Sequence, residues 1–379
     1  MSVSIPQTVV YKQVTNHLST IDVHLDVYPP SFFPANSTAF FVPAVIYFHG
    51  GGLTVGNRQS WFPTWLYNRT TNAGYAFISA DYQLLPPATG HDIVQDIQAV
   101  LHASTEGLGF WVNPEAIAVA GSSAGGLCAY LAAVHCTSPK PKAIISMYGM
   151  GGDFFTSHYL SPKARPFFRG REILDPRDFI DYLHPNHDPD APTDPRRFAS
   201  LHPVADSALA YHPQTYHIPG YPANPRMLLP RLYLQLGVFL DYFTGAHDDG
   251  GISIPLRDAL ISKHESEAYD DSVAEFDNLI RTLVPVQHHG LFPHFAASKD
   301  WPPTLLVHGT EDSAVPIWDS RHLVKRLKAL GVNVELYEVQ GREHSFDYET
   351  GAEDLFGDVF DRVGDFLRSH IGGELNSSN

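Results

Sequence analysis

The chain has 379 residues, of which 44% are hydrophobic, so it can bury a sizeable core. Its formal net charge of −16 repels phosphate backbones and anionic lipids, which argues against nucleic acid or a membrane surface as partner. No apolar run is long enough to span a membrane, and the N-terminus lacks the basic and apolar segments of a signal peptide. We therefore expect a globular protein of the cytoplasm.

The first 150 residues read as strands that alternate with helices. Alternation of apolar and polar residues over 8–28 predicts an antiparallel hairpin at the edge of a sheet. Continuous apolar runs then predict buried parallel strands, separated by stretches with apolar residues at helical spacing. The predicted strands are 44–48, 75–80, 116–120 and 142–148, and the predicted helices are 58–73, 91–104 and the stretch after residue 123.

The same rhythm resumes near the C-terminal end of the chain. Strands are predicted over 304–307 and 334–339, and helices over about 317–330 and 352–370. Strands that alternate with helices predict an α/β fold, in which a mostly parallel sheet carries helices on both faces.

Between these two parts the pattern breaks. Residues 151–299 are rich in Pro, His, Asp and Tyr, with plausible helices near 225–243 and 270–283. Because a structureless loop of this length is implausible in a compact domain, we expect a largely helical cap or lid inserted into a core formed by 1–150 and 300–379. The apolar stripe at 227–243 predicts either packed core or the wall of an acyl pocket.

The two cysteines, Cys128 and Cys136, fall in one predicted helix. Eight residues of helix span about 12 Å, which is too far for a disulfide. Two unpaired thiols fit a reducing compartment, where the sequons at Asn36 and Asn68 are expected to stay unmodified.

Residues 121–126 read Gly-Ser-Ser-Ala-Gly-Gly at the junction of a predicted strand and helix. Ser123 is the centre of a G-x-S-x-G pattern, whereas the register centred on Ser122 has alanine at both glycine positions. Neighbours without side chains permit a sharp turn that projects the serine hydroxyl at the carboxyl end of the sheet. The pattern also occurs in ordinary turns, but an apolar strand before it and an apolar helix after it favour Ser123 as a nucleophile.

A serine hydroxyl needs an adjacent base, and the base needs an orienting carboxylate. In this type of fold the order along the chain is Ser, then Asp or Glu, then His. Asp312 and Glu311 follow one predicted strand and His344 follows the next, so both loops lie at the same edge of the sheet as Ser123. We expect a catalytic triad of Ser123, Asp312 and His344, with Glu311 as the weaker alternative acid. His308 precedes the acid and does not fit this order.

His49-Gly50-Gly51-Gly52 directly follows the predicted strand 44–48. Three glycines leave backbone N–H groups unobstructed, so they can converge on an oxyanion, although such a tract alone is more often a flexible loop. Its place at the carboxyl end of a central strand favours the oxyanion role. His49 is expected to stabilise the loop by hydrogen bonding and not to act as an acid or base.

These motifs resemble those of the hormone-sensitive-lipase-like branch of the α/β-hydrolase superfamily. The matching segments are HGGG, GSSAGG, HGTEDSAVP and GREHSF, and DYQLLP is similar to that branch's DYRLAP. Ser122 stands where Asp is common, Gln83 stands where Arg is usual, and the acid loop is more similar to that of peptidase-like relatives. The long insert and the run YGMGGDFF are similar to fungal members, many of which act in secondary metabolism.

The resemblance implies an α/β-hydrolase sheet and a serine esterase that acts on small or medium apolar substrates. The N–H groups of Gly51, Gly52 and Ala124 would form the oxyanion hole. Ser123 would attack an acyl carbonyl, and His344 would take the serine proton and return it to the leaving group. No cofactor is implied. A thioesterase, lactonase or transacylase would use the same residues, while a non-catalytic receptor is disfavoured because receptors of this branch tend to lose the catalytic histidine.

The insert is dense in histidine, including His184, His187, His288 and His289, which makes metal binding conceivable. No pair there has H-x-x-x-H spacing with a third ligand at a recognisable distance, so we expect no metal site. The acidic turns at 188–190 and 247–250 lack the alternating oxygen ligands of a calcium loop.

Overall fold

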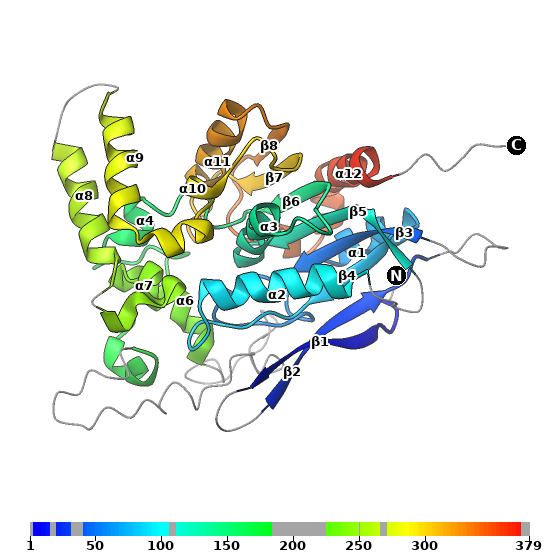
Figure 1. Ribbon diagram of the computed structural model, residues 1–379, viewed down its shortest axis with the longest axis horizontal. Helices are drawn as coiled ribbons and strands as arrows, with labels where there is room; N and C mark the ends of the chain where they lie inside the picture. Colours follow the sequence, from blue (N-terminus) through cyan, green and yellow to red (C-terminus); the bar gives the residue numbers. More distant parts are fainter. Residues whose placement is uncertain are drawn as a thin grey trace, which may run out of the picture.

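A single mixed sheet forms the centre of the computed structural model, which describes residues 3–15, 20–31, 41–105, 111–183, 225–249, 251–265 and 271–372. Within these residues, eight strands follow the order β1-β2-β4-β3-β5-β6-β7-β8 (Figure 1). Their bounds are β1 Gln7–Thr15, β2 Thr20–Tyr28, β3 Phe41–Phe48, β4 Ala76–Ala80, β5 Trp111–Ser122, β6 Ala143–Met147, β7 Thr304–Gly309 and β8 Val334–Val339.

Only the edge hairpin departs from parallel pairing. Strand β1 pairs antiparallel with β2, and β2 pairs antiparallel with β4, while all other neighbours are parallel. The mostly parallel α/β sheet and the hairpin at its edge, both predicted from the sequence, are confirmed. Parallel pairing brings the carboxyl ends of β3, β5, β7 and β8 to one edge of the sheet, and the candidate site residues follow these four strands.

Helices cover both faces, so each central strand is buried on two sides and reads as an unbroken apolar run. Helices α2 (Gly90–Ala103), α3 (Ala124–His135) and α11 (Trp318–Ala329) pack on the face that includes Ile46. Helices α1 (Thr64–Asn72) and α12 (Ala352–Ile371) pack on the opposite face, which includes Val45 and Tyr47. Successive residues of β3 therefore supply two separate cores.

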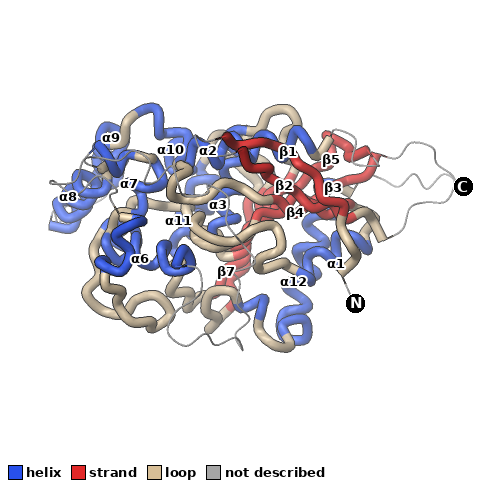
Figure 2. The backbone as a smooth tube through the Cα atoms, turned by 90° about the horizontal axis from the view of Figure 1, so that it is seen from below, coloured by secondary structure: helices blue, strands red, loops and turns tan. Residues whose placement is uncertain are grey.

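Between β6 and β7, the described residues form helices and no strand. They are α4 (Ser157–Leu160), α6 (Leu229–Leu236), α7 (Phe239–Thr244), α8 (Ser253–Glu265), α9 (Asp271–Leu283) and α10 (Pro293–Ala296), with short 3₁₀ turns such as η5 (Val286–Leu291). Figures 1 and 2 both place α8 and α9 at the end of the molecule opposite α1 and α12. The bounds 151–299 for a cap stay a prediction.

Two sequence-based expectations about helices need correction, and one helix was not predicted. The single helix predicted near 225–243 is split at Gly237, whose left-handed φ of +66 ends α6. A Cβ there would lie 2.5 Å from Leu160 O, so the position requires glycine. The helix predicted over 58–73 begins only at Thr64, directly after Pro63. Helix α8 was not predicted at all.

The apolar stripe at 227–243 is buried for the most part. Leu229, Leu232, Phe239 and Phe243 are fully buried in the same core as α2 and α3. For these side chains, packed core is the observed role.

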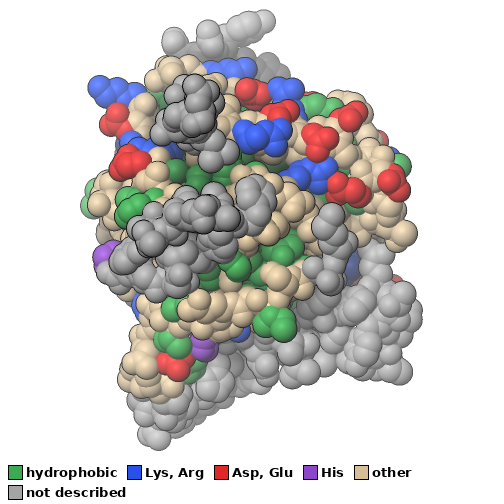
Figure 3. Space-filling view, turned by 90° about the vertical axis from the view of Figure 1, so that its right-hand side faces the viewer, with side chains coloured by type: hydrophobic (Ala, Val, Ile, Leu, Met, Phe, Trp, Pro, Cys, Tyr) green, Lys and Arg blue, Asp and Glu red, His purple; other side chains and the backbone are tan. Residues whose placement is uncertain are grey.

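The surface is mixed in charge. On the face in Figure 3, acidic and basic side chains lie interspersed. The described chain also has exposed ion pairs, such as Arg362 with Glu335, 2.5 Å apart. None of the helices in the described ranges combines the length and the apolar composition needed to cross a bilayer.

Candidate active site

Ser123 occupies the sharp turn between β5 and α3. Its backbone has φ 55 and ψ −119, a conformation that residues with a side chain rarely adopt. Hydrogen bonds to the end of β6 fix this turn, because Ser123 N–H donates to Met147 O at 2.9 Å and Met150 N–H donates to Ser123 O at 3.0 Å. The serine is held in a strained geometry that exposes its side chain at the carboxyl edge of the sheet.

The glycines of the pattern are required by close backbone approaches. A Cβ on Gly121 would lie 2.0 Å from Gly125 O, and a Cβ on Gly125 would lie 1.9 Å from Phe48 O at the end of β3. Both distances are far inside van der Waals contact, so β5, α3 and β3 can meet here only without side chains.

We expect Gly125→Ala to lower the free energy of unfolding by about 3 kcal/mol or more, because the clashing atom is a backbone oxygen in the sheet. Urea unfolding followed by circular dichroism would measure this loss. Gly357→Ala in α12 is the matched control, because a Cβ there meets nothing within 4 Å. That variant should be neutral or slightly stabilising. Equal stability of the two variants would contradict the steric account.

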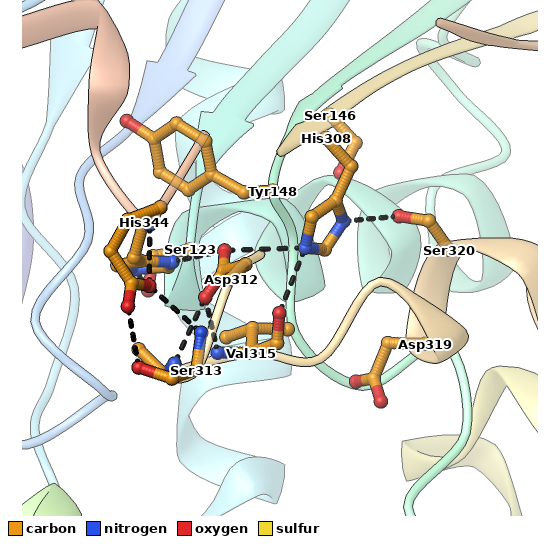
Figure 4. A network of polar contacts seen from close by, with 12 residues as sticks. Ser123, Ser146, Tyr148, His308, Asp312, Ser313, Val315, Asp319, Ser320 and His344 are labelled. Carbon is orange, nitrogen blue, oxygen red and sulfur yellow. Dashed lines mark hydrogen bonds and ion pairs between the residues drawn. The ribbon is translucent and has the colours of Figure 1, made fainter. Parts of the chain in front are cut away.

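His344 lies in the loop after β8 and connects the serine to a carboxylate. Its Nε2 is 3.0 Å from Ser123 Oγ, and its Nδ1 is 2.6 Å from Asp312 Oδ2 (Figure 4). The imidazole is only 10% exposed. Three residues predicted from the sequence thus lie in one hydrogen-bonded row, although they come from three distant loops.

Asp312 is buried, accepts three hydrogen bonds and lies beside the ring of His308. Its Oδ1 accepts from the N–H groups of Ala314 at 2.9 Å and Val315 at 2.8 Å. Its Oδ2 faces His344 Nδ1 and, at 3.2 Å, His308 Nε2. Burial alone would raise the pKa of Asp312, but attraction to both histidines and the hydrogen bond from His344 hold that pKa well below its ordinary value.

The alternative acid does not reach the histidine. Glu311 is exposed, and its backbone N–H donates to Arg342 O at 3.0 Å. The neighbouring serine, Ser122, is buried and forms a hydrogen bond with Tyr47 instead of His344. Its Oγ lies 2.7 Å from the hydroxyl of Tyr47.

Two residues around the acid loop have supporting roles that the sequence did not indicate. His308 is fully buried, with Nδ1 2.7 Å from Ser320 Oγ and Nε2 2.8 Å from Val315 O, so it braces the loop that holds Asp312. Glu343 accepts from the backbone N–H groups of Ser313 and His344, both at 2.8 Å. It thereby ties the acid loop to the histidine loop. Both residues belong to the quoted motifs, but no spacing indicated these contacts.

The glycine loop after β3 lies against the serine turn. A Cβ on Gly50 would be 3.4 Å from Ser123 Cβ, so the two loops are in contact. Gly51 and Gly52 have φ of +105 and +63, and a Cβ on Gly52 would lie 2.4 Å from side-chain atoms of Pro230 in α6. The loop is therefore confined between the serine turn and the helices that follow β6.

His49 stabilises the glycine loop, in the way expected from the sequence. Its Nδ1 is 2.7 Å from Gly50 O, and its ring stacks on Tyr82 with centroids 4.4 Å apart. Burial lowers the pKa of His49 to about 4, so the ring is neutral at pH 7. Tyr82, from the DYQLLP segment, donates its hydroxyl to His49 O at 2.8 Å.

A buried arginine joins this loop to the insert. Arg226, just before α6, donates to Thr54 O at 2.8 Å, to Leu85 O at 3.0 Å and to Pro86 O at 2.8 Å. Together with Pro230, it fixes the start of α6 on the loops at the carboxyl edge of the sheet.

The histidines of the insert are only partly described. His184, His187, the turn at 188–190 and the sequon at Asn36 lie outside the described residues, as does residue 250. His288 in η5 shares a hydrogen bond with His91 of α2, with 2.8 Å between ring nitrogens. The described ranges hold no group of three or more His, Cys, Asp or Glu side chains placed to bind a metal ion. Both cysteines are buried free thiols.

The sheet is mostly parallel, a serine lies on a strand-to-helix turn, and the histidine and acid loops lie at the same edge as that serine. This combination defines an α/β-hydrolase fold. A family model described as alpha/beta hydrolase fold matches residues 45–216, and one for the prolyl oligopeptidase family matches residues 265–374. The chain therefore has the α/β-hydrolase fold, and its similarity to the model of that name covers somewhat less than half of its length.

Two known proteins are similar in sequence to this chain. A probable carboxylesterase M8 of a Phoma species is 34% identical over 117 residues, which are 28% of this chain and 37% of that protein. The non-reducing polyketide synthase prhL of Penicillium brasilianum is 23% identical over 394 residues, covering 96% of this chain and 14% of the synthase. The matches thus span well under half the length of these relatives.

The fold has a counterpart among solved structures. An esterase of Thermogutta terrifontis superimposes with a TM-score of 0.54 and 17% sequence identity, covering 99% of this chain and 95% of that one. At this identity the likeness concerns the fold.

Proposed function

We propose that this chain is a serine hydrolase that cleaves carboxylic esters of small or medium apolar substrates. The hydrogen-bonded row of Ser123, His344 and Asp312, with distances of 3.0 and 2.6 Å, is the observation that carries the proposal. The similarity to a probable carboxylesterase supports it.

In the proposed mechanism, Ser123 Oγ attacks the carbonyl carbon of the ester while His344 Nε2 takes the serine proton. The N–H groups of Gly51 and Gly52, in the glycine loop, and of Ala124, at the N-terminus of α3, stabilise the negative charge that develops on the carbonyl oxygen. His344 then gives its proton to the departing alcohol, which leaves an acyl group on Ser123. Water, activated by His344 in turn, releases the acid and restores the serine.

Asp312 has two tasks in this scheme. It fixes the tautomer of His344 that carries a proton on Nδ1, and it stabilises the imidazolium that forms in each half-reaction. Its three hydrogen bonds and its lowered pKa keep the carboxylate ionised throughout.

We further propose that 151–299 forms a cap over this edge of the sheet. The contact of Pro230 with Gly52 and the bonds of Arg226 support a cap that forms one wall beside the oxyanion loop. The cytoplasmic location expected from the sequence stays a prediction.

A fluorophosphonate probe tests the proposed nucleophile directly. We expect one covalent adduct per chain, which peptide mass spectrometry locates on Ser123, and turnover of p-nitrophenyl acetate and butyrate that the probe abolishes. Esters of increasing acyl length would then define the pocket. An adduct on another residue, or absence of both labelling and turnover, would contradict the proposal.

A second candidate is a thioesterase, lactonase or transacylase of fungal-type secondary metabolism. The similarity of nearly the whole chain to a segment of a polyketide synthase favours it. Such an enzyme would form the same acyl-enzyme and differ in the acyl donor or acceptor. Offering one acyl group as an ester, a thioester and a lactone, with water or an added alcohol as acceptor, would separate these activities by kcat/KM. The contact of His344 with Ser123 speaks against a non-catalytic receptor.

A further inference from the structure

A buried carboxylate that the mechanism does not use lies behind the catalytic histidine. Asp347 follows His344 by three residues, in the 3₁₀ turn η6 (Phe346–Tyr348), and is 6% exposed. Its Oδ1 accepts the hydroxyl of Tyr148 at 2.5 Å, and its Oδ2 accepts the indole N–H of Trp65 at 3.0 Å. Both donors come from other elements, so this carboxylate joins α1, the end of β6 and the histidine loop.

Tyr148 carries this connection to His344. The two rings lie with centroids 4.6 Å apart and planes inclined by 63°, and Figure 4 shows the phenol beside the imidazole. Tyr148 has φ +41, a strained conformation, and its N–H donates to Val307 O at 2.7 Å. The preceding residue, Met147, accepts the backbone hydrogen bond of Ser123. The strained backbone therefore places the ring of Tyr148 against His344, one residue beyond the backbone group that holds the serine turn.

We propose that Tyr148 and Asp347 are positioning residues for His344. The phenol ring holds the imidazole in line between Asp312 and Ser123. The Asp347 carboxylate fixes that phenol and adds negative potential that favours the imidazolium formed as the serine proton is transferred. This inference rests on the proposed function.

The groups that face Asp347 are mostly neutral at the pH of an esterase assay. Tyr47, Tyr148 and Tyr348 are phenols whose pKa values burial raises above the ordinary value, so they stay protonated. Trp65 carries no charge. His344 is thus the group through which the charge of Asp347 can act on the proposed proton transfer.

The charged side chains on the far side of Asp347 are paired with one another. A cavity between α1 and α12 reaches Asp347 and is also lined by Arg69, Glu349, Glu353 and Asp361. Glu349 pairs with Arg342 at 3.2 Å. Arg69 bridges to Glu353 at 2.6 Å and to Asp361 at 2.9 Å.

Burial raises the pKa of Asp347 to about 6, so this carboxyl changes its charge within the pH range in which activity can be measured.

Asp347→Asn tests the proposal with little disturbance of shape. The amide oxygen can accept from Trp65, and the amide N–H can donate to the Tyr148 hydroxyl, which then acts as acceptor. We expect kcat/KM for p-nitrophenyl butyrate at pH 8 to fall roughly tenfold relative to the parent enzyme. Near pH 5 the ratio should approach one, because Asp347 is then protonated in the parent and both proteins carry the same charge.

Two companion variants sharpen the test. Tyr148→Phe keeps the ring but removes one donor to Asp347, so the pKa of Asp347 should rise. The change in kcat/KM that accompanies ionisation of Asp347 should therefore occur at a higher pH than in the parent. Asp361→Asn removes a carboxylate from the same cavity but away from His344, and should leave the pH profile unchanged.

Folding is checked by thermal unfolding of Asp347→Asn at pH 8. Because the pKa of Asp347 is raised, its ionised form costs folding free energy above about pH 6, and the variant should unfold at a temperature no lower than the parent. A loss of kcat/KM that is independent of pH, or no loss at pH 8, would overturn the proposal while leaving the proposed function intact. A parent chain inactive towards esters and fluorophosphonates would overturn both.

Discussion

Replacing Ser123 with alanine should lower kcat for ester hydrolysis on the order of 10⁴-fold or more. The substitution removes the one hydroxyl that lies 3.0 Å from His344 Nε2, so no acyl-enzyme can form. The backbone hydrogen bonds of residue 123 to Met147 and Met150 do not involve the side chain, and the fold should persist. Steady-state kinetics with p-nitrophenyl butyrate and circular dichroism would measure the two effects.

Ser122→Ala is the matched control for this experiment. The adjacent serine is buried and its hydroxyl pairs with Tyr47, so its loss should change kcat only a few-fold. If Ser122→Ala were the inactive variant and Ser123→Ala kept its rate, the nucleophile would be misassigned.

Asp312→Asn should lower kcat by about 10⁴-fold, mainly through the tautomer of His344. The amide oxygen would keep the two backbone N–H groups of Ala314 and Val315, so the amide N–H₂ would face His344. His344 would then have to accept at Nδ1 and carry its proton on Nε2, where it can no longer take the proton of Ser123. Kinetics at saturating substrate would show the loss in kcat.

Glu311→Gln distinguishes the two carboxylates of the acid loop. Because Glu311 is exposed and Asp312 holds the contact with His344, we expect the Gln variant to stay close to the parent rate. The reverse pattern, an inactive Glu311→Gln with an active Asp312→Asn, would show that the acid had been taken from the wrong position.

The sheet and the three central side chains could be predicted because their signals are local. Each candidate residue lies in a loop that follows a predicted strand, and parallel strands bring such loops to one edge whatever lies between them in the chain. The pattern around Ser123 also has a steric cause, since Gly121 and Gly125 are the positions where a Cβ would meet backbone.

The supporting residues could not be predicted because their roles depend on distant contacts. Glu343 bonds the loop of Asp312, and Asp347 bonds Trp65 on a helix 282 residues away in the chain. No periodicity marks such pairs. Helix α8 was not predicted for a different, local reason. Pro255 lies in its first turn, where a helix tolerates proline, but in the sequence alone this residue suggests that a helix ends.

The contact between Pro230 and Gly52 bears on how the proposed enzyme can be re-engineered. The first turns of α6 fill the space that a side chain at position 52 would need, and Arg226 is anchored on carbonyls of two neighbouring loops. An insert transplanted from another hydrolase would lack these atoms and leave the glycine loop unsupported. Chimeras designed to alter substrate preference should therefore retain residues 226–230 from the host, so that selectivity can be varied without slowing the chemistry.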